Sequence, residues 1–282
     1  MKYFLSLLVS ALVMAGLGPA PSAWAQDVST EAAVPRFVPA AERLPVGTLV
    51  RVPGEPEFQA PWRVGEYLEY ELRMSPLGRV ARATFSVQAG EAVQGVPTVR
   101  FHSRVRGRVL LAPVEKDNLS WVDPRTMVSL RYESQAREFT FRKHDRVDIR
   151  PAEGVWVEEF SGDTGPLPSA WPVDQLALLY YARGLPLNVG DSIRITRYFR
   201  VYENPVEIRV LRREEVEVPA GTFPALVVEI HFAPRRRFED GGTTTLYLSD
   251  DPRRLLLRME TPVPIFGTVD MRLTGFGRPV GG

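Results

Sequence analysis

From residue 62 onward, the chain alternates between apolar and polar side chains. Four segments show this period of two clearly: residues 67–74, 128–133, 226–231 and 255–260. Alternation of this kind is typical of a strand with one buried and one exposed face, and such strands are typical of antiparallel sheets. Turns rich in glycine, proline and aspartate separate the segments. We therefore predict a mainly β fold.

One segment, residues 169–184, breaks this alternation. Its larger side chains recur at intervals of three and four: Leu176, Leu179, Tyr180 and Arg183. Asp174 can cap a first helical turn, and Gly184 stands where a helix commonly ends. The pattern predicts one short central helix, whose apolar residues cover the buried face of the sheet or close one end of it.

The two halves of the β region resemble each other. Three motifs recur in the same order and at nearly constant spacing: residues 64–68 with 189–193, 95–102 with 221–231, and 123–133 with 251–260. Such self-similarity indicates an internal repeat. We expect residues 61–282 to form one β domain of two related halves, about 61–160 and 185–280, each a meander of five or six strands. The resulting antiparallel curved sheets either cover each other like a sandwich or continue into one strongly bent sheet, an open barrel.

The N-terminus has the features of an export signal. Lys2 precedes an apolar run over residues 3–17, and Ala23 and Ala25 are the small residues that a signal peptidase requires. We predict a signal peptide over residues 1–25; an uncleaved membrane anchor is the alternative. Residues 26–60 are rich in proline and predict a flexible tether, with a partner-binding arm as the alternative.

The composition limits the cellular location and the binding partners that we expect. The chain has no cysteine, so it has neither disulfides nor a lipid-bearing cysteine, and the export signal predicts a soluble periplasmic or secreted product with no stable transmembrane segment after cleavage. Its 35 basic and 34 acidic residues nearly balance, and neither sign forms a long block. This distribution predicts neither a nucleic-acid partner nor a strongly anionic target surface.

Several motifs together resemble a known family. They are WRVGEYLEY at 62–70, DQLALLYYAR at 174–183 followed by Gly190 and Asp191, VEVPAGTFPA at 216–225 and SDDP at 249–252. In this order they are similar to the bacterial family called domain of unknown function 3108, over roughly residues 61–276. The resemblance implies an exported, mainly β protein of uncharacterised role, and it brings no catalytic residues.

Motifs of catalysis and cofactor binding are not found in the sequence. His102, His144 and His231 lack the spacing of metal ligands, and there is no glycine-flanked nucleophile, phosphate loop or dinucleotide motif. We therefore predict no catalytic residue, metal or cofactor. His102 and His231 occupy similar places in the two halves, and they either approach each other or lie separately on a polar face.

Two kinds of charged cluster leave their roles open. Glu158–Glu159, Glu214–Glu215 and Asp250–Asp251 are adjacent acidic pairs, which fit exposed edges and turns better than an acid–base pair, because neighbours in a strand point to opposite faces. Arg235, Arg236 and Arg237 fit a solvated hairpin tip, with an anion or headgroup contact as the alternative.

Aromatic residues supply the candidate ligand site. Six of them either line a pocket or belong to the ordinary core: Trp62, Tyr70, Tyr180, Tyr181, Phe199 and Tyr202. The candidate ligand-binding residues are Tyr70, Asp174, Tyr180, Tyr181 and Arg183. Asp174 and Arg183 position the helix, the former as its cap and the latter through its guanidinium, while Tyr180 and Tyr181 border the cavity.

Three hypotheses for the function follow from these features. The first is a non-enzymatic binding or carrier protein of the cell envelope for an apolar or lipid-like ligand, by analogy with open-barrel carriers. The second is a hydrolase of envelope polymers with carboxylates between the halves. The third is a periplasmic scaffold that binds an envelope protein through a sheet edge and the tether.

Overall fold

The computed structural model describes residues 48–50, 58–75, 77–109, 112–138, 141–233, 242–263 and 267–277. The predicted signal peptide, most of the predicted tether and Arg235–Arg237 lie outside these residues. Before the helix, the described chain contains β1 (Thr48–Val50), β2 (Tyr67–Met74), β3 (Gly78–Ala89), β4 (Val99–Val109), β5 (Ala112–Val122), β6 (Ser129–Glu138), β7 (Phe141–Arg150), β8 (Val155–Glu158) and β9 (Thr164–Pro166).

The second half follows a single α-helix in the described chain, α2 (Gln175–Arg183). Its elements are β10 (Ser192–Ile195), the 3₁₀ turn η2 (Val201–Glu203), β11 (Val206–Val218), β12 (Gly221–His231), β13 (Thr243–Ser249), β14 (Leu256–Val263) and β15 (Gly267–Gly277). Within the described residues, no helix has the length and apolar character needed to span a membrane.

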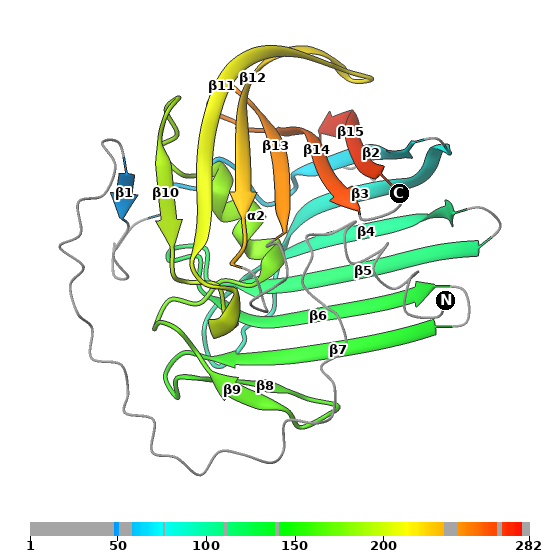
Figure 1. Cartoon of the computed structure of the whole chain (residues 1–282). Coiled ribbons are helices and arrows are strands. Elements are labelled where there is room, and N and C mark those ends of the chain that lie inside the picture. Colours follow the sequence, from blue (N-terminus) through cyan, green and yellow to red (C-terminus); the bar gives the residue numbers. More distant parts are fainter. Residues whose placement is uncertain are drawn as a thin grey trace.

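All described strands belong to one curved sheet (Figure 1). Its order is β1-β10-β11-β12-β13-β14-β15-β2-β3-β4-β5-β6-β7-β8-β9, and every neighbouring pair is antiparallel except β1 with β10. The last strand, β15, pairs with β2 and thereby joins the two halves. Of the two arrangements that the sequence left open, the structure has the continuous bent sheet, and this sheet remains open.

The first turn of each half has the same backbone geometry. Gly65 and Gly190 both have a positive φ, 94° and 92°, which favours glycine. The Gly65 N–H donates to the Val87 carbonyl at 2.8 Å, and the Gly190 N–H donates to the Val210 carbonyl at 2.9 Å. Strands β2–β7 and β10–β15 are two successive six-strand meanders that begin with this same turn.

A second pair of turns also corresponds between the halves. In one, the Asp123 carboxylate accepts a hydrogen bond from the Arg125 N–H at 3.0 Å, and in the other the Asp251 carboxylate accepts from the Arg253 N–H at 2.8 Å. Each turn then contains a residue with positive φ that is not glycine. The recurring Asp-Pro-Arg motif therefore encodes the same aspartate-stabilised turn twice.

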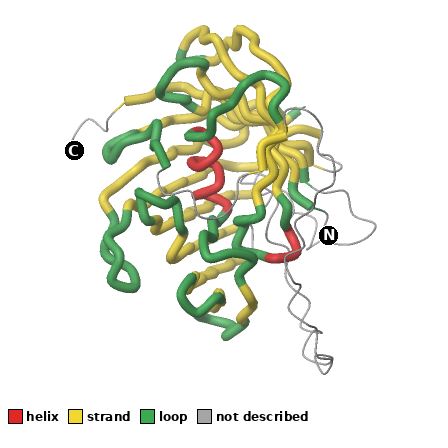
Figure 2. Tube along the Cα trace, turned by 90° about the vertical axis from the view of Figure 1, so that its left-hand side faces the viewer, coloured by secondary structure: helices red, strands yellow, loops and turns green. Residues whose placement is uncertain are grey.

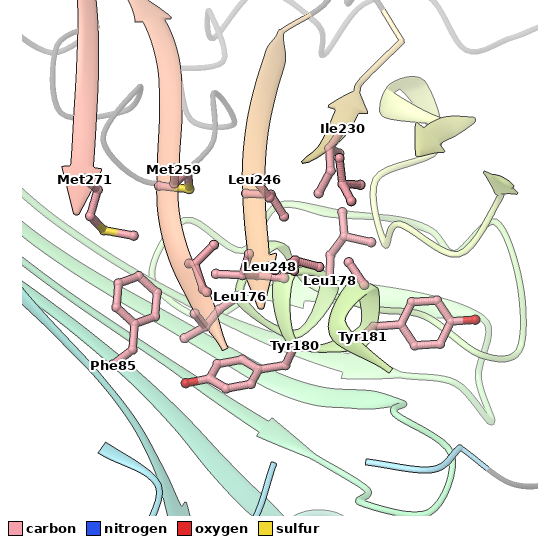
Figure 3. Packing of buried hydrophobic residues seen from close by; sticks show 14 of the residues in the cluster. Phe85, Leu176, Leu178, Tyr180, Tyr181, Ile230, Leu246, Leu248, Met259 and Met271 are labelled. Carbon is pink, nitrogen blue, oxygen red and sulfur yellow. The ribbon is translucent and has the colours of Figure 1, made fainter. Parts of the chain in front are cut away.

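The main core lies on the concave side of the sheet, around α2. All nine residues of the helix are buried. Figure 2 shows α2 between the two arms of the sheet, and Figure 3 shows its apolar side chains next to those of β12–β15. The helix begins at Gln175, later than the predicted start at residue 169, because Pro172 disfavours a preceding helical residue and Val173 forms a β-bridge with Tyr198.

Two described pieces of the predicted tether contact the domain. Residues 48–50 form β1, which pairs with β10. The ring of Phe58 stacks on Tyr181 with centroids 5.4 Å apart, and the Phe58 N–H donates to the Arg125 carbonyl at 3.2 Å. The flexibility of the remaining tether stays a prediction.

Ion pairs cover the outer face where β14 and β15 meet. Arg258 and Arg272 both contact the Asp270 carboxylate, at 2.9 and 2.7 Å. Burial alone would raise the pKa of the Asp270 carboxyl, but the hydrogen bonds and charges of the two arginines outweigh burial and hold this pKa below its ordinary value of 3.8. Asp270 therefore remains ionised in the folded protein at a pH at which the unfolded chain takes up a proton.

We predict a pH-dependent effect of Asp270→Asn on stability. Because the unfolded state binds more protons in this range, Asp270 stabilises the fold above about pH 4, and this contribution is lost as the pH falls through the lowered native pKa. The variant should be less stable than the wild type at pH 7, with the gap narrowing below about pH 4. Urea unfolding across this pH range measures it, with the exposed Asp163→Asn as control; a gap that stays constant down to pH 3 would contradict the prediction.

Candidate functional site

Asp174 fixes the N-terminus of α2 to the sheet. Its carboxylate accepts hydrogen bonds from the N–H groups of Leu176 and Ala177, at 2.8 and 2.9 Å, as the sequence predicted for a cap. The same carboxylate accepts from Ser120 Oγ of β5 at 2.5 Å, and the Asp174 N–H donates to Ser129 Oγ of β6 at 2.9 Å. Burial raises the pKa of the Asp174 carboxyl above its ordinary value, although these hydrogen bonds lower it.

Arg183 fixes the C-terminus of the helix to both halves of the chain. Its guanidinium forms a two-pronged ion pair with Glu66, just before β2, with N–O distances of 2.7 and 2.9 Å. It also donates to the carbonyls of Arg254 and Arg253, at 2.8 and 3.2 Å, in the turn before β14. The Arg183 side chain is only 1% exposed, so this pair is held in the core.

Gly184 follows the helix with a φ of −90°, and glycine suits this position because its surroundings leave little room for a side chain. A Cβ atom at this position would lie 2.2 Å from the Phe58 ring and 3.1 Å from the Gln59 carbonyl oxygen. The Gly184 N–H donates to the Tyr181 carbonyl at 3.0 Å. The chain before β2 therefore packs directly against the end of α2.

Tyr70, Tyr180 and Arg183 meet around one small cavity. Tyr180 stacks face to face on Phe101, with ring centroids 4.0 Å apart, and the Arg183 guanidinium lies 5.3 Å from its ring centre. The Tyr70 hydroxyl donates to the Leu256 carbonyl at 2.8 Å. The buried Tyr180 hydroxyl has no hydrogen-bond partner among the described residues.

The cavity itself is small and mostly apolar. Its volume is about 10 Å³, roughly the space of one water molecule. The side chains that line it come from β2, β3, α2 and β14: Leu68, Tyr70, Phe85, Leu179, Tyr180, Arg183 and Leu256. Burial raises the pKa of both tyrosine hydroxyls far above the ordinary value, so both stay protonated.

Tyr181 points away from this cavity, to the opposite side of α2 (Figure 3). Its ring contacts Phe58, and the Arg197 guanidinium lies 4.8 Å from its centre. Arg197 also donates to the Thr126 carbonyl at 2.9 Å, in the turn before β6. Tyr180 therefore lies against Arg183, which binds the turn before β14, and Tyr181 lies against Arg197, which binds the corresponding turn before β6.

The structure therefore places the predicted site residues at three different locations around α2. Tyr70, Tyr180 and Arg183 border one cavity, Tyr181 lies on the other side of the helix, and Asp174 lies at its far end. Sequence reasoning missed Glu66, the partner of Arg183, because no local pattern links two residues 117 positions apart. The recurrence of an acidic residue after glycine in both halves is the one signal that could have drawn attention to it.

Sequence reasoning also missed a buried polar network on the concave face. The Asn118 side chain donates to Ser103 Oγ at 3.0 Å and accepts from the hydroxyls of Tyr132 and Ser134, both at 2.9 Å. Gln175, the first residue of α2, donates to Tyr132. This network connects β4, β5 and β6 to the start of the helix.

The remaining aromatic and histidine candidates do not line the cavity. Trp62 and Phe199 are buried in the core, while Tyr202 is 48% exposed. His102 pairs with Asp117 and His231 with Glu229, at 3.0 and 2.9 Å. Five strands separate β4 from β12 in the sheet order, so these two histidines do not approach each other. Across the described ranges, no three histidine, aspartate or glutamate side chains gather as metal ligands would.

Five of the six carboxylates in the adjacent acidic pairs have arginine or backbone partners among the described residues; Glu215 is the exception. Their contacts are Glu158 with the Arg146 N–H, Glu159 with Arg146, Glu214 with Arg212, Asp250 with Arg213 and Arg254, and Asp251 with Arg253. An arginine beside a carboxyl group favours its ionised form, and such a group is poorly suited to donate a proton.

The fold and site define a class of protein: a mainly β protein whose described residues form one large, open antiparallel sheet bent around one buried helix. Residues 69–274 match the model of the family described as protein of unknown function DUF3108, and the chain belongs to this family. The resemblance seen in the sequence is thereby confirmed. No curated protein matches the chain.

Solved structures resemble the chain at low sequence identity. A β-barrel-like protein of the domain of unknown function DUF1849 from Brucella abortus has a TM-score of 0.52 at 11% identity, covering 77% of this chain and 99% of that one. The hypothetical protein CT021 from Chlamydia trachomatis has a TM-score of 0.37 at 9% identity, covering 78% and 90%. The first likeness supports the fold alone.

Proposed function

We propose that this protein is an exported, non-enzymatic binding protein of the cell envelope that holds one apolar or lipid-like molecule on the concave side of its sheet, beside α2. Export is supported by the N-terminal sequence, with its basic residue, apolar run and Ala-Trp-Ala site. The binding role is supported by the cavity between the sheet and the helix.

The observation that carries the proposal is the chemistry of this cavity. Its lining is apolar apart from Arg183 and the tyrosine hydroxyls, and the Tyr180 hydroxyl points into the core without a partner in the described chain. Binding sites for apolar ligands combine such a lining with a few polar groups. This cavity of about 10 Å³ is too small for a lipid, so on this proposal we expect the ligand to enter by displacing side chains of α2, a short helix that polar contacts hold at both ends.

The two other hypotheses have less support. A hydrolase would need two carboxylates facing a cleft, whereas five of the six carboxylates in the acidic pairs are held by arginines or backbone groups. A scaffold that adds a partner strand could use residues 211–218 of β11 or 141–145 of β7, which pair with a strand on one side only in the described sheet, but no observation points to a partner there.

Uptake of a fluorescent fatty acid by the delipidated protein tests the proposal. We expect saturable binding to the wild type and binding weakened roughly tenfold in Leu68→Phe, because extra carbon atoms in packed space cost about 1–3 kcal/mol. Leu130→Phe is the matched control, because Leu130 belongs to a separate buried cluster with Val93, Trp121 and Val128. Absence of uptake, or equal binding by wild type and Leu68→Phe, would overturn the proposal.

A further inference from the structure

Seven arginines gather on the outer face of the sheet, at one end of strands β2–β7. They are Arg73, Arg79, Arg82, Arg106, Arg108, Arg137 and Arg142, and all are exposed. This end contains the ends of β2, β4 and β6 and the beginnings of β3, β5 and β7, and it lies on the right in Figure 1. We call this group the arginine surface.

Strand register places most of these side chains in one row. The row runs through directly opposed residues of six consecutive strands: Glu71, Arg82, Arg106, Glu115, Arg137 and Arg142. Strands are about 4.8 Å apart, so the row is about 24 Å wide. Within this row Glu71 and Glu115 are the acidic residues, and Asp270 of β15 lies opposite Arg73 at its edge, so arginines outnumber acids and the surface is positive.

The arginine surface contains like charges in direct opposition. Three cross-strand pairs are arginine with arginine: Arg73 with Arg79, Arg82 with Arg106, and Arg137 with Arg142. Opposed like charges destabilise a sheet. Nearer the other end of the same strands, outer-face arginines oppose acids instead: Arg104 with Asp117, Arg131 with Asp148, and Arg146 with Glu133.

Most of the arginine surface has no internal counter-charge. Arg73 contacts Glu71 at 3.4 Å, whereas the other six arginines form no ion pair with another described residue. Exposed guanidinium groups that repel one another across strands are stabilised by an external anion. The charge distribution therefore fits an anionic partner of similar width.

Exposed apolar side chains lie at the same end of the sheet. Leu77, between β2 and β3, is 40% exposed, and Phe141, the first residue of β7, is 44% exposed. Phe141 and Arg142 are consecutive in β7, so their side chains leave the strand on opposite faces, but both stand at the hairpin end; Leu77 lies in the hairpin two residues before Arg79. Apolar groups close to basic groups are typical of proteins that bind at a lipid interface. A nucleic acid would need only the basic groups, so the apolar side chains favour a lipid partner.

We propose that the arginine surface docks this protein on an anionic phospholipid bilayer, with the hairpin ends that carry Leu77 and Phe141 entering the headgroup region. The guanidinium groups pair with lipid phosphates, which arginine binds with two parallel hydrogen bonds. This surface lies on the opposite face of the sheet from the cavity proposed above, so docking does not depend on that function.

Co-sedimentation with vesicles tests this inference. The purified protein should bind vesicles that contain phosphatidylglycerol, bind weakly to vesicles of phosphatidylcholine alone, and dissociate as salt rises. Arg106→Gln with Arg137→Gln should weaken binding by about 25-fold, since each basic residue near an anionic surface contributes roughly 5-fold. Arg63→Gln with Arg194→Gln removes the same charge from exposed positions elsewhere and should leave binding unchanged.

Two results would overturn the inference. One is equal vesicle binding by the two double variants, which would show that net charge and not the arginine surface matters. The other is binding to a soluble polyanion such as dextran sulfate without binding to phosphatidylglycerol vesicles, which would assign the surface to a different partner. Thermal unfolding of both double variants checks folding, and both should resemble the wild type because all four arginines are exposed and lack ion pairs in the described chain.

Discussion

Arg183→Met should destabilise the protein by about 3–5 kcal/mol, the range measured when one partner of a buried ion pair is removed. The substitution leaves the Glu66 carboxylate, 13% exposed, without its cation. It also removes the donors from the carbonyls of Arg253 and Arg254, which lie 70 and 71 positions away in the chain. A loss of this size is a large fraction of the 5–15 kcal/mol that is typical of domain stability. Urea unfolding measures it.

Two further variants distinguish the ion pair from general damage. Glu66→Leu combined with Arg183→Met removes both charges, so it should recover a large part of the loss, because no charge remains buried alone. Arg194→Met changes an exposed arginine and should alter stability by less than about 0.5 kcal/mol. A cost below about 1 kcal/mol for Arg183→Met would mean that the pair does not hold the helix.

Asp174→Ala should cost about 2–4 kcal/mol. Loss of a helix cap alone costs about 0.5–2 kcal/mol. Here the Leu176 and Ala177 N–H groups and the Ser120 hydroxyl all lose their acceptor inside the core, and a buried polar group without a partner adds about 1–3 kcal/mol. Urea unfolding measures the loss, and the start of α2 should become the first part of the helix to exchange its amide hydrogens.

Asp174→Asn separates capping from charge. Asparagine is also a good cap, so this variant should retain much of the stability that alanine loses. Asp163→Ala, at an exposed aspartate, is the control for loss of a carboxylate and should be nearly neutral. Equal losses for the alanine and asparagine variants would show that the charge, and not the cap, is what the fold requires.

Local pattern predicted much of this fold correctly. Alternation, aspartate-stabilised turns and the helix with its cap at Asp174 each depend on residues within a few positions of one another, so a single sequence contains the information. The recurring motifs likewise predicted two related meanders. The start of the helix was less accurate, because Pro172 and the bridge between Val173 and Tyr198 compete with helical geometry.

The candidate site could be predicted only in part. Tyr180, Tyr181 and Arg183 stand out in the sequence because they share one helix, whereas Tyr70 lies in β2. Their partners Glu66, Phe101 and Leu256 come from three other elements, and no spacing rule connects them. The roles of Tyr70, Asp174, Tyr180, Tyr181 and Arg183 in ligand binding remain predictions until uptake is measured.

The sequence by itself determined which segments are strands, where the chain turns, and that one short capped helix lies between two similar halves, because period and turn chemistry act locally. Only the tertiary structure decided that β15 joins β2 into one sheet, that the helix fills its concave side, and that scattered arginines become one surface. Charge balance along the chain gave no sign of that surface. Strand register brings residues from five strands to the same end of the sheet, and register is fixed by the packing of the whole core.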